Sequence, residues 1–184
     1  MMTSEKKEVA VDVSLRCKRI ILPSELTEFK KFLKTSWLKE EYGDVYDRWL
    51  DEAIGDVSKK TREAYAVFKA GYNQDQAPSS KIVGGCILNL VNGKMMELKS
   101  FVDCGEEDVC ISIHKTVEQI AIERGYQGIY TTVPTTRDKL LVSFIERKYT
   151  IGGVSERYEP SRLTYFLTKK LQSRYVGDPY DWQV

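Results

Sequence analysis

The fold of this chain is decided by residues 81–134, which read KIVGGCILNLVNGKMMELKSFVDCGEEDVCISIHKTVEQIAIERGYQGIYTTVP. Two apolar runs flank Asn92-Gly93, a dipeptide that strongly favours a β-hairpin turn. The second run, 95–102, leads through an acidic turn into a helical pattern at 108–125, and the apolar residues 128–133 follow. Because a helix separates strands 95–102 and 128–133, we predict that these two strands run parallel.

The sequence on either side of this stretch predicts the rest of a mixed sheet. The predicted strands are 13–22, 64–69, 154–158 and 163–168; two short helices lie within 24–54, and a third spans 138–149 and ends at Gly152-Gly153. The order is β-αα-β-β-β-α-β-α-β-β. It predicts an α/β (α+β) fold with a mixed, mostly antiparallel central sheet of about seven strands and helices on both faces.

Length and composition favour one soluble domain. The chain has 184 residues, of which 42% are hydrophobic and 30% charged, and this length suffices to bury a core. We predict a flexible tail at 1–12, a single domain at 13–171 and an aromatic C-terminal extension at 172–184. Three accounts of that extension stay open: its aromatic side chains pack on the domain, they pack on a partner subunit, as in a homodimer, or the segment is what remains of a link to a domain lost from a longer ancestor.

Charge and cysteine usage exclude several classes of protein. With 28 Lys and Arg against 27 Asp and Glu, no global field attracts nucleic acid or an anionic membrane. No apolar run approaches the roughly 20 residues that span a bilayer, and the polar N-terminus lacks the apolar core of a signal peptide. Four scattered cysteines and one histidine predict no metal site, and they favour reduced thiols in the cytoplasm.

The order of elements over 13–171 resembles the Gcn5-related N-acetyltransferase (GNAT) superfamily. The likeness lies in the hairpin at Asn92-Gly93, the following strand with Glu97, the long helix that ends at Gly125, and the segment 141–149 (LVSFIERKY), which is similar to the family's late helix. The resemblance implies a GNAT-like fold. It also implies an N-acyltransferase that uses acetyl-CoA or another acyl-CoA as co-substrate.

In that family the coenzyme lies in a V-shaped gap between the fourth and fifth strands, here 95–102 and 128–133. Its pyrophosphate binds the turn that begins the central helix, where free N–H groups and the helix dipole favour an anion. The residues to which the resemblance assigns cofactor binding are Phe101, Val102, Asp103, Gly105, Cys110 and Lys148. The structural alternatives are a buried, idle thiol for Cys110 and a solvated surface position for Lys148.

The resemblance also assigns two catalytic roles. Glu97 takes the place of a glutamate base that deprotonates the acceptor ammonium, and Tyr149 is a candidate to protonate the leaving thiolate. A strand glutamate paired with Lys99, and a packed aromatic, are the structural alternatives. The period of a strand places Glu97, Lys99 and Phe101 on one face of the strand.

The turn at 103–108 departs from the family pattern. It reads DCGEED, whereas the family usually has Arg/Gln-x-x-Gly-x-Gly/Ala. We expect these acids to cap the helix amides themselves. They would also repel a pyrophosphate, by roughly 1 kcal/mol for each close pair in a water-like medium.

Three functional hypotheses follow. The first is transfer of an acyl group from acyl-CoA to an amine-bearing small molecule or protein. The second is a GNAT fold without acetyltransferase activity that acts as a binding or assembly module. The third takes the acyl group from another carrier, such as an acyl-carrier protein or aminoacyl-tRNA, although near-neutral charge speaks against tRNA.

Overall fold

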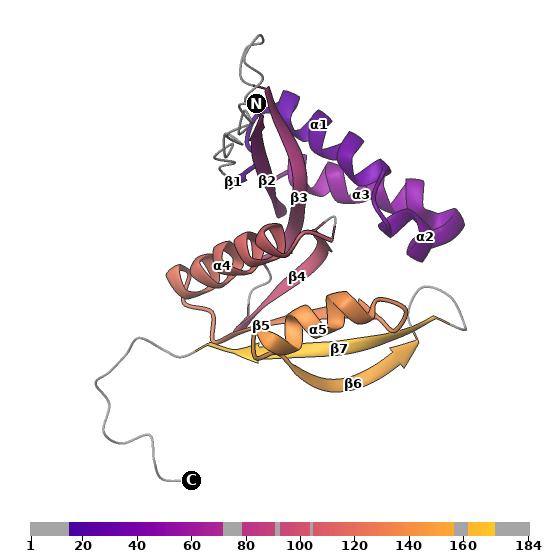
Figure 1. The fold of residues 1–184 in the computed structure, drawn as a ribbon, viewed down its shortest axis with the longest axis vertical. Helices are drawn as coiled ribbons and strands as arrows, with labels where there is room; N and C mark the ends of the chain where they lie inside the picture. Colours follow the sequence, from indigo (N-terminus) through magenta and orange to yellow (C-terminus); the bar gives the residue numbers. More distant parts are fainter. Residues whose placement is uncertain (1–14, 72–78, 91–92, 104, 157–161, 172–184) are drawn as a thin grey trace, which may run out of the picture.

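One mixed sheet organises the described part of the computed structural model, which comprises residues 15–71, 79–90, 93–103, 105–156 and 162–171. Within it, seven strands lie in the order β1-β2-β3-β4-β5-β7-β6 (Figure 1). Every neighbouring pair is antiparallel except β4 and β5, which run parallel. The strands are β1 (Leu15–Arg19), β2 (Arg62–Gly71), β3 (Ser79–Asn89), β4 (Met95–Val102), β5 (Gly128–Pro134), β6 (Thr150–Glu156) and β7 (Leu163–Lys170).

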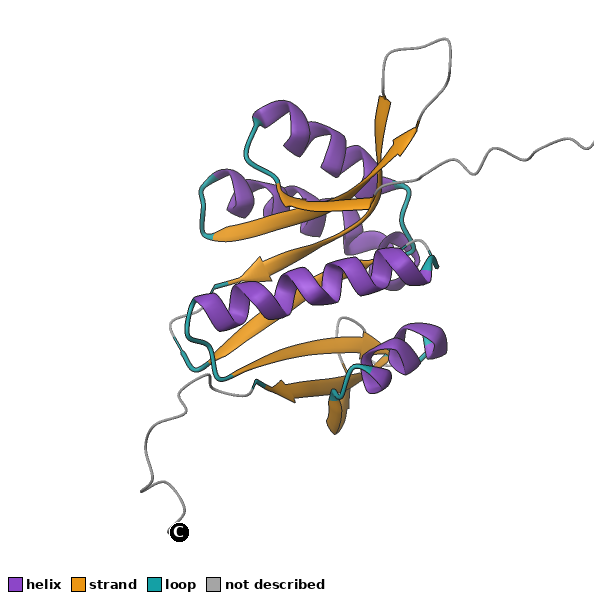
Figure 2. Ribbon diagram, turned by 60° about the vertical axis from the view of Figure 1, so that its left-hand side comes forward, coloured by secondary structure: helices purple, strands orange, loops and turns teal. Residues whose placement is uncertain are grey.

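Helices cover both faces of the sheet, and the predicted order of elements is confirmed (Figure 2). One buried apolar cluster joins α4 and α5 to the sheet, and a second joins α1, α2 and α3 to it. The helices are α1 (Pro23–Lys34), α2 (Leu38–Tyr42), the 3-10 turn η1 (Gly43–Val45), α3 (Tyr46–Ser58), α4 (Glu107–Glu123) and α5 (Asp138–Glu146).

The end of α5 differs from the prediction. We expected the helix to reach 149, but it ends at Glu146, and the predicted stop Gly152-Gly153 lies inside β6. Lys148 takes a left-handed conformation with φ of 63°. The Tyr149 N–H donates to the Phe144 carbonyl and the Lys148 N–H to that of Ile145, at 3.1 and 2.9 Å. These bonds form a Schellman motif, which ends the helix early and allows β6 to begin at Thr150.

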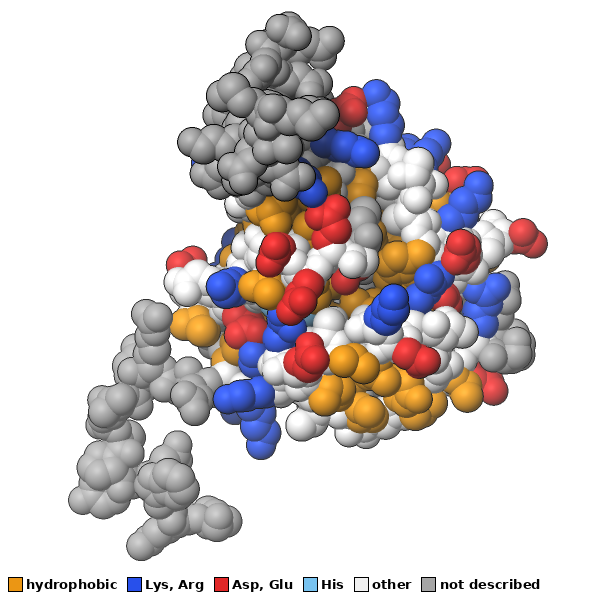
Figure 3. Space-filling model, in the orientation of Figure 1, with side chains coloured by type: hydrophobic (Ala, Val, Ile, Leu, Met, Phe, Trp, Pro, Cys, Tyr) orange, Lys and Arg blue, Asp and Glu red, His pale blue; other side chains and the backbone are white. Residues whose placement is uncertain are grey.

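Charges of both signs are interspersed over the face drawn in Figure 3, which also shows apolar side chains gathered at its lower end. Four exposed apolar residues lie on α5 and β6: Val142, Ile145, Ile151 and Val154. Large exposed apolar patches often mark contact surfaces. The homodimer stays a prediction.

Some predictions fall outside the described residues. These are the tail at 1–12, the aromatic extension at 172–184 and the turn residue Asn92. Among the residues that are described, no helix has the length and apolar character needed to cross a membrane.

Candidate functional site

The candidate site lies where β4 and β5 part. Their described residues pair from Met95 with Gly128 to Leu98 with Thr131, and the pairing stops there. The Thr131 hydroxyl donates a hydrogen bond to the Leu98 carbonyl at 2.7 Å. Beyond this point the two strands separate toward their carboxyl ends, which produces the V-shaped gap that the resemblance implied.

A β-bulge in β4 shapes one side of the gap. The register with β3 shifts between Ile87 and Leu88, and Lys99 becomes the extra residue in β4. The alternation of faces therefore shifts by one residue. Phe101 packs in the same core cluster as Leu98 instead of sharing a face with Glu97, so the predicted common face is wrong beyond the bulge.

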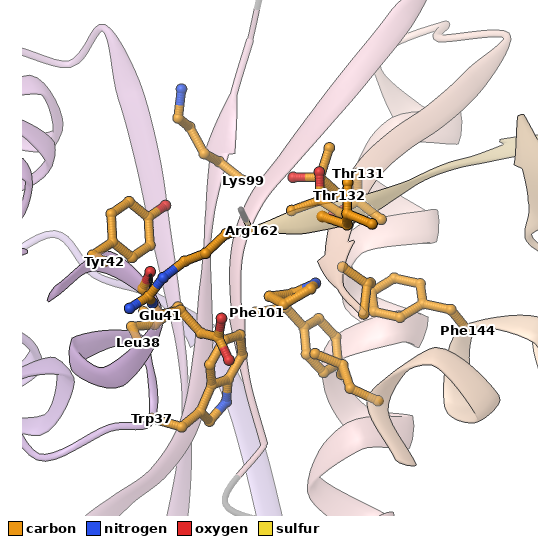
Figure 4. Close-up of a pocket in the computed structure, with 15 residues that line it drawn as sticks. Trp37, Leu38, Glu41, Tyr42, Lys99, Phe101, Thr131, Thr132, Phe144 and Arg162 are labelled. Carbon is orange, nitrogen blue, oxygen red and sulfur yellow. Dashed lines mark hydrogen bonds between the residues drawn. The ribbon is translucent and has the colours of Figure 1, made fainter. Parts of the chain in front are cut away.

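The gap opens into a groove with mostly apolar walls (Figure 4). Trp37 and residues along the whole of α2 form one wall, and the other walls come from β4, β5, α5 and the start of β7. Arg162 reaches across the groove toward Glu41. The groove is lined by Trp37, Leu38, Glu41, Tyr42, Lys99, Phe101, Thr131, Thr132, Val133, Pro134, Leu140, Phe144, Arg162, Leu163 and Thr164.

An aromatic cluster lies behind the groove wall. The ring of His114, on α4, lies 4.8 Å from that of Phe101 and 4.6 Å from that of Phe144, measured between centroids. Tyr149 packs on Phe144 at 4.9 Å. Both His114 nitrogens and the Tyr149 hydroxyl are buried without a hydrogen-bond partner among the described residues. Burial lowers the pKa of His114 to about 3, with Arg147 and Lys169 adding to the effect.

A second hollow meets the groove at Trp37 and Leu140. It lies between the turn that precedes α4 and the start of α5. Its other lining residues are Asp103, Gly105, Thr136, Arg137, Asp138 and Lys139.

The acids of the turn before α4 do not cap the first amides of this helix, contrary to our expectation. The N-cap residue is Glu106, which makes no side-chain capping hydrogen bond and pairs instead with Lys69 of β2 at 3.1 Å. Asp103 accepts a hydrogen bond from the Gly105 N–H at 3.0 Å, and Gly105 has a φ of 75° that favours glycine. Among the described residues, the side-chain cap that would compete with an anion for the first α4 amides is therefore absent.

Glu97 lies next to the groove rather than in its lining. The residue is 7% exposed, and its carboxylate accepts a hydrogen bond from Asn89 Nδ2 at 2.8 Å. Lys99 Nζ lies 3.9 Å from Glu97 Oε1, and Lys99 does line the groove. Glu97 is therefore connected to the groove indirectly, through Lys99 at the bulge.

The other predicted site residues are divided between site and core. Phe101 lines the groove, and Asp103 and Gly105 line the second hollow. Four lie in the lining of neither: Val102 is buried against the α1–α3 side, Cys110 and Tyr149 are buried on the α4–α5 side, and Lys148 is exposed. Burial raises the pKa of the Cys110 thiol and of the Tyr149 hydroxyl, so the Cys110 thiol stays protonated near neutrality.

Sequence reasoning pointed to Arg137 as a possible phosphate contact but missed Glu41 and Arg162 at the mouth of the groove. Glu41 of α2 accepts hydrogen bonds from Thr136 and Arg137, which are 95 and 96 residues away in sequence. A contact between such distant segments leaves no local pattern. Among the described residues, no group of three or more His, Cys, Asp or Glu side chains is placed to hold a metal ion.

The fold of this chain is similar to that of solved acetyltransferases. A probable acetyltransferase from Staphylococcus epidermidis ATCC 12228 matches with a TM-score of 0.68 and 14% identity, over 86% of this chain and 100% of that one. An N-acetyltransferase from Staphylococcus aureus Mu50 matches with a TM-score of 0.62 and 11% identity, over 85% and 97%.

A spermidine N-acetyltransferase SpeG chimera from Vibrio cholerae and hSSAT matches with a TM-score of 0.58 and 13% identity, over 85% of this chain and 95% of that one. No protein-family model matches the chain, and no curated protein matches its sequence. These likenesses establish that the chain has the GNAT fold.

Proposed function

We propose that this protein transfers an acyl group from an acyl-CoA to an amine on a small molecule or a protein. The observation that carries the proposal is the separation of β4 from β5 beyond Leu98 and Thr131, with the groove opening between them. A thioester on an extended arm needs an apolar slot with backbone groups along one side. The stretch of β4 after the bulge supplies both.

The residues of the groove and hollow fit a coenzyme in part. Phe101, Phe144 and Leu140 offer apolar contact to a pantetheine arm, and the start of α4 offers amides to a diphosphate. The acids of the turn oppose the diphosphate, because Asp103 lines the same hollow. We therefore expect weaker donor binding than an Arg- or Gln-containing turn would provide.

In this proposal Glu97 acts as the general base. The acceptor ammonium loses a proton to Glu97, directly or through a water, and the nitrogen of the resulting amine attacks the thioester carbonyl. The new C–N bond forms as the C–S bond breaks, and the second proton that the nitrogen loses neutralises the leaving thiolate through solvent. Tyr149 has no part in this step, since its hydroxyl is buried outside the groove.

A second candidate function is a binding module that keeps the fold without catalysis. The observation that favours it is the charge of the second hollow, where Asp103 and Asp138 offset Lys139, and Arg137 pairs with Glu40 and Glu41. Such a protein would retain the groove but bind no coenzyme.

Thermal unfolding with acetyl-CoA separates the two. A ligand at 100 times its Kd stabilises the folded state by about 2.7 kcal/mol, which is roughly 5–10 °C in Tm for a domain of this size. An unchanged Tm at millimolar acetyl-CoA would contradict the proposed transferase function. If the shift appears, Glu97→Gln should keep it and slow acyl transfer, while Glu52→Gln, on the exposed face of α3, should leave both unchanged.

A further inference from the structure

Four charged residues tie α2 across the mouth of the groove; we call them the α2 latch. Arg137 Nη2 lies 2.6 Å from Glu40 Oε2, and Arg137 Nε lies 3.0 Å from Glu41 Oε1. Arg162 Nη1 donates to the Glu40 carbonyl at 2.6 Å and also to the Glu41 carbonyl. The latch thus joins α2 to the segments that follow β5 and precede β7.

The latch forms part of the groove itself. Glu41 and Arg162 both line it, and Figure 4 shows them side by side, with Trp37 below. The Arg137 guanidinium lies 4.9 Å from the Trp37 ring centroid, so it covers the point where the groove meets the second hollow. A ligand that spans groove and hollow must pass this arginine.

Arg137 is also the better of the two cations in that hollow for a diphosphate. Its planar guanidinium offers paired donors to phosphate oxygens, whereas Lys139 is a point charge. In the structure those donors are engaged by carboxylates. The pair with Glu40 is weakly held, because the Glu40 side chain is 75% exposed, and a diphosphate carries enough charge to replace it.

We propose that the donor opens the Arg137 side of the α2 latch: the diphosphate of the acyl-CoA displaces Glu40 and Glu41 from Arg137, and Arg162 alone of the latch cations then holds α2 at the groove mouth. This rests on the proposed function and adds a specific residue to it. The acidic turn before α4 lacks an arginine of its own, and Arg137 takes that role from the start of α5. Because α2 lines the groove, the loss of its contacts with Arg137 also loosens the wall that an acceptor would meet.

The test compares two donors that share the pantetheine arm and differ in the diphosphate. Kd values for acetyl-CoA and for acetyl-pantetheine are measured by calorimetry on wild type, Arg137→Gln and the double variant Glu40→Gln/Glu41→Gln. Arg48→Gln, an exposed arginine on α3, is the matched control. We expect Arg137→Gln to weaken acetyl-CoA about tenfold and to leave acetyl-pantetheine unchanged, and the double variant to bind acetyl-CoA several-fold more tightly.

The outcomes separate the latch from the proposed function. If wild type binds neither donor, the proposed function fails, and the latch fails with it. If wild type binds both donors and Arg137→Gln binds acetyl-CoA as wild type does, only the latch is overturned. Equal loss of both donors in Arg137→Gln assigns the residue a structural role and overturns the latch, as does a double variant that binds acetyl-CoA no more tightly.

Discussion

Acidification should destabilise this protein through His114, the single histidine of the chain. The residue is 1% exposed, and neither ring nitrogen has a partner among the described residues. Burial, followed by the positive charges of Arg147 and Lys169, lowers its pKa from 6.5 to about 3. The folded protein therefore holds His114 neutral over a range in which the unfolded chain would protonate it.

The sign of the effect follows from proton binding. Below pH 6.5 the unfolded chain binds a proton at this histidine and the folded protein does not, so stability falls as the pH drops from 6.5 toward 3. Each pH unit in that window costs about 1.4 kcal/mol. Between pH 7 and pH 5 the loss is about 2 kcal/mol, or roughly 4–8 °C in Tm for a domain of this size.

Urea unfolding of wild type and His114→Leu at pH 7 and pH 5 measures this loss. Carboxylates that titrate in the same range contribute equally to both proteins, so the difference between them isolates His114. We expect wild type to lose about 2 kcal/mol more than the variant over this interval. A single histidine also gives one set of imidazole NMR signals, which should not shift between pH 8 and pH 5 in the folded protein.

Two results would refute the reasoning. The first is an imidazole signal in the folded protein that titrates near pH 6.5, which would mean that His114 reaches solvent or a hidden partner. The second is equal acid sensitivity of wild type and His114→Leu.

Three further substitutions test the packing of the sheet and its helices. Glu63 is 6% exposed and pairs with Arg19 and Arg124 at 2.6 and 2.8 Å; Glu63→Gln should cost about 2 kcal/mol in urea unfolding, and a loss below about 0.5 kcal/mol would show that water replaces the carboxylate. Gly55→Ala should stabilise α3 by about 0.5–1 kcal/mol, since a Cβ added at this position would have no neighbour within 4 Å. Gly85→Ala should destabilise by at least 1–3 kcal/mol, since its Cβ would lie 2.6 Å from a backbone oxygen of β2; equal Tm values for the two alanine variants would contradict both expectations.

For the acidic turn before α4, the sequence predicted the place of the turn correctly but predicted the contacts of its carboxylates wrongly. Its place at the end of β4 and the start of α4 follows from local signals. The partner of Glu106 does not, because Lys69 lies 37 residues away on β2. The Glu106 carboxylate pairs with Lys69 instead of capping the first amides of α4. These amides are therefore more accessible to an anion than the sequence suggested.

The sequence by itself determined the order of strands and helices, the parallel pairing of β4 with β5 and the GNAT-like layout. These depend on hydrophobic period, the Asn92-Gly93 turn signal and the length of the α4 crossover, all of which are local. Through the resemblance, it also pointed to Phe101, Asp103 and Gly105, which line the groove or the hollow in the structure, and their part in cofactor binding stays a prediction.

Only the tertiary structure decided which side chains face the site. The bulge at Lys99 depends on the register with β3 and moves Phe101 away from the face of Glu97. The α2 latch depends on segments that are about 100 residues apart in the chain. Register and long-range ion pairs form because whole elements pack together, and no window of sequence contains both partners.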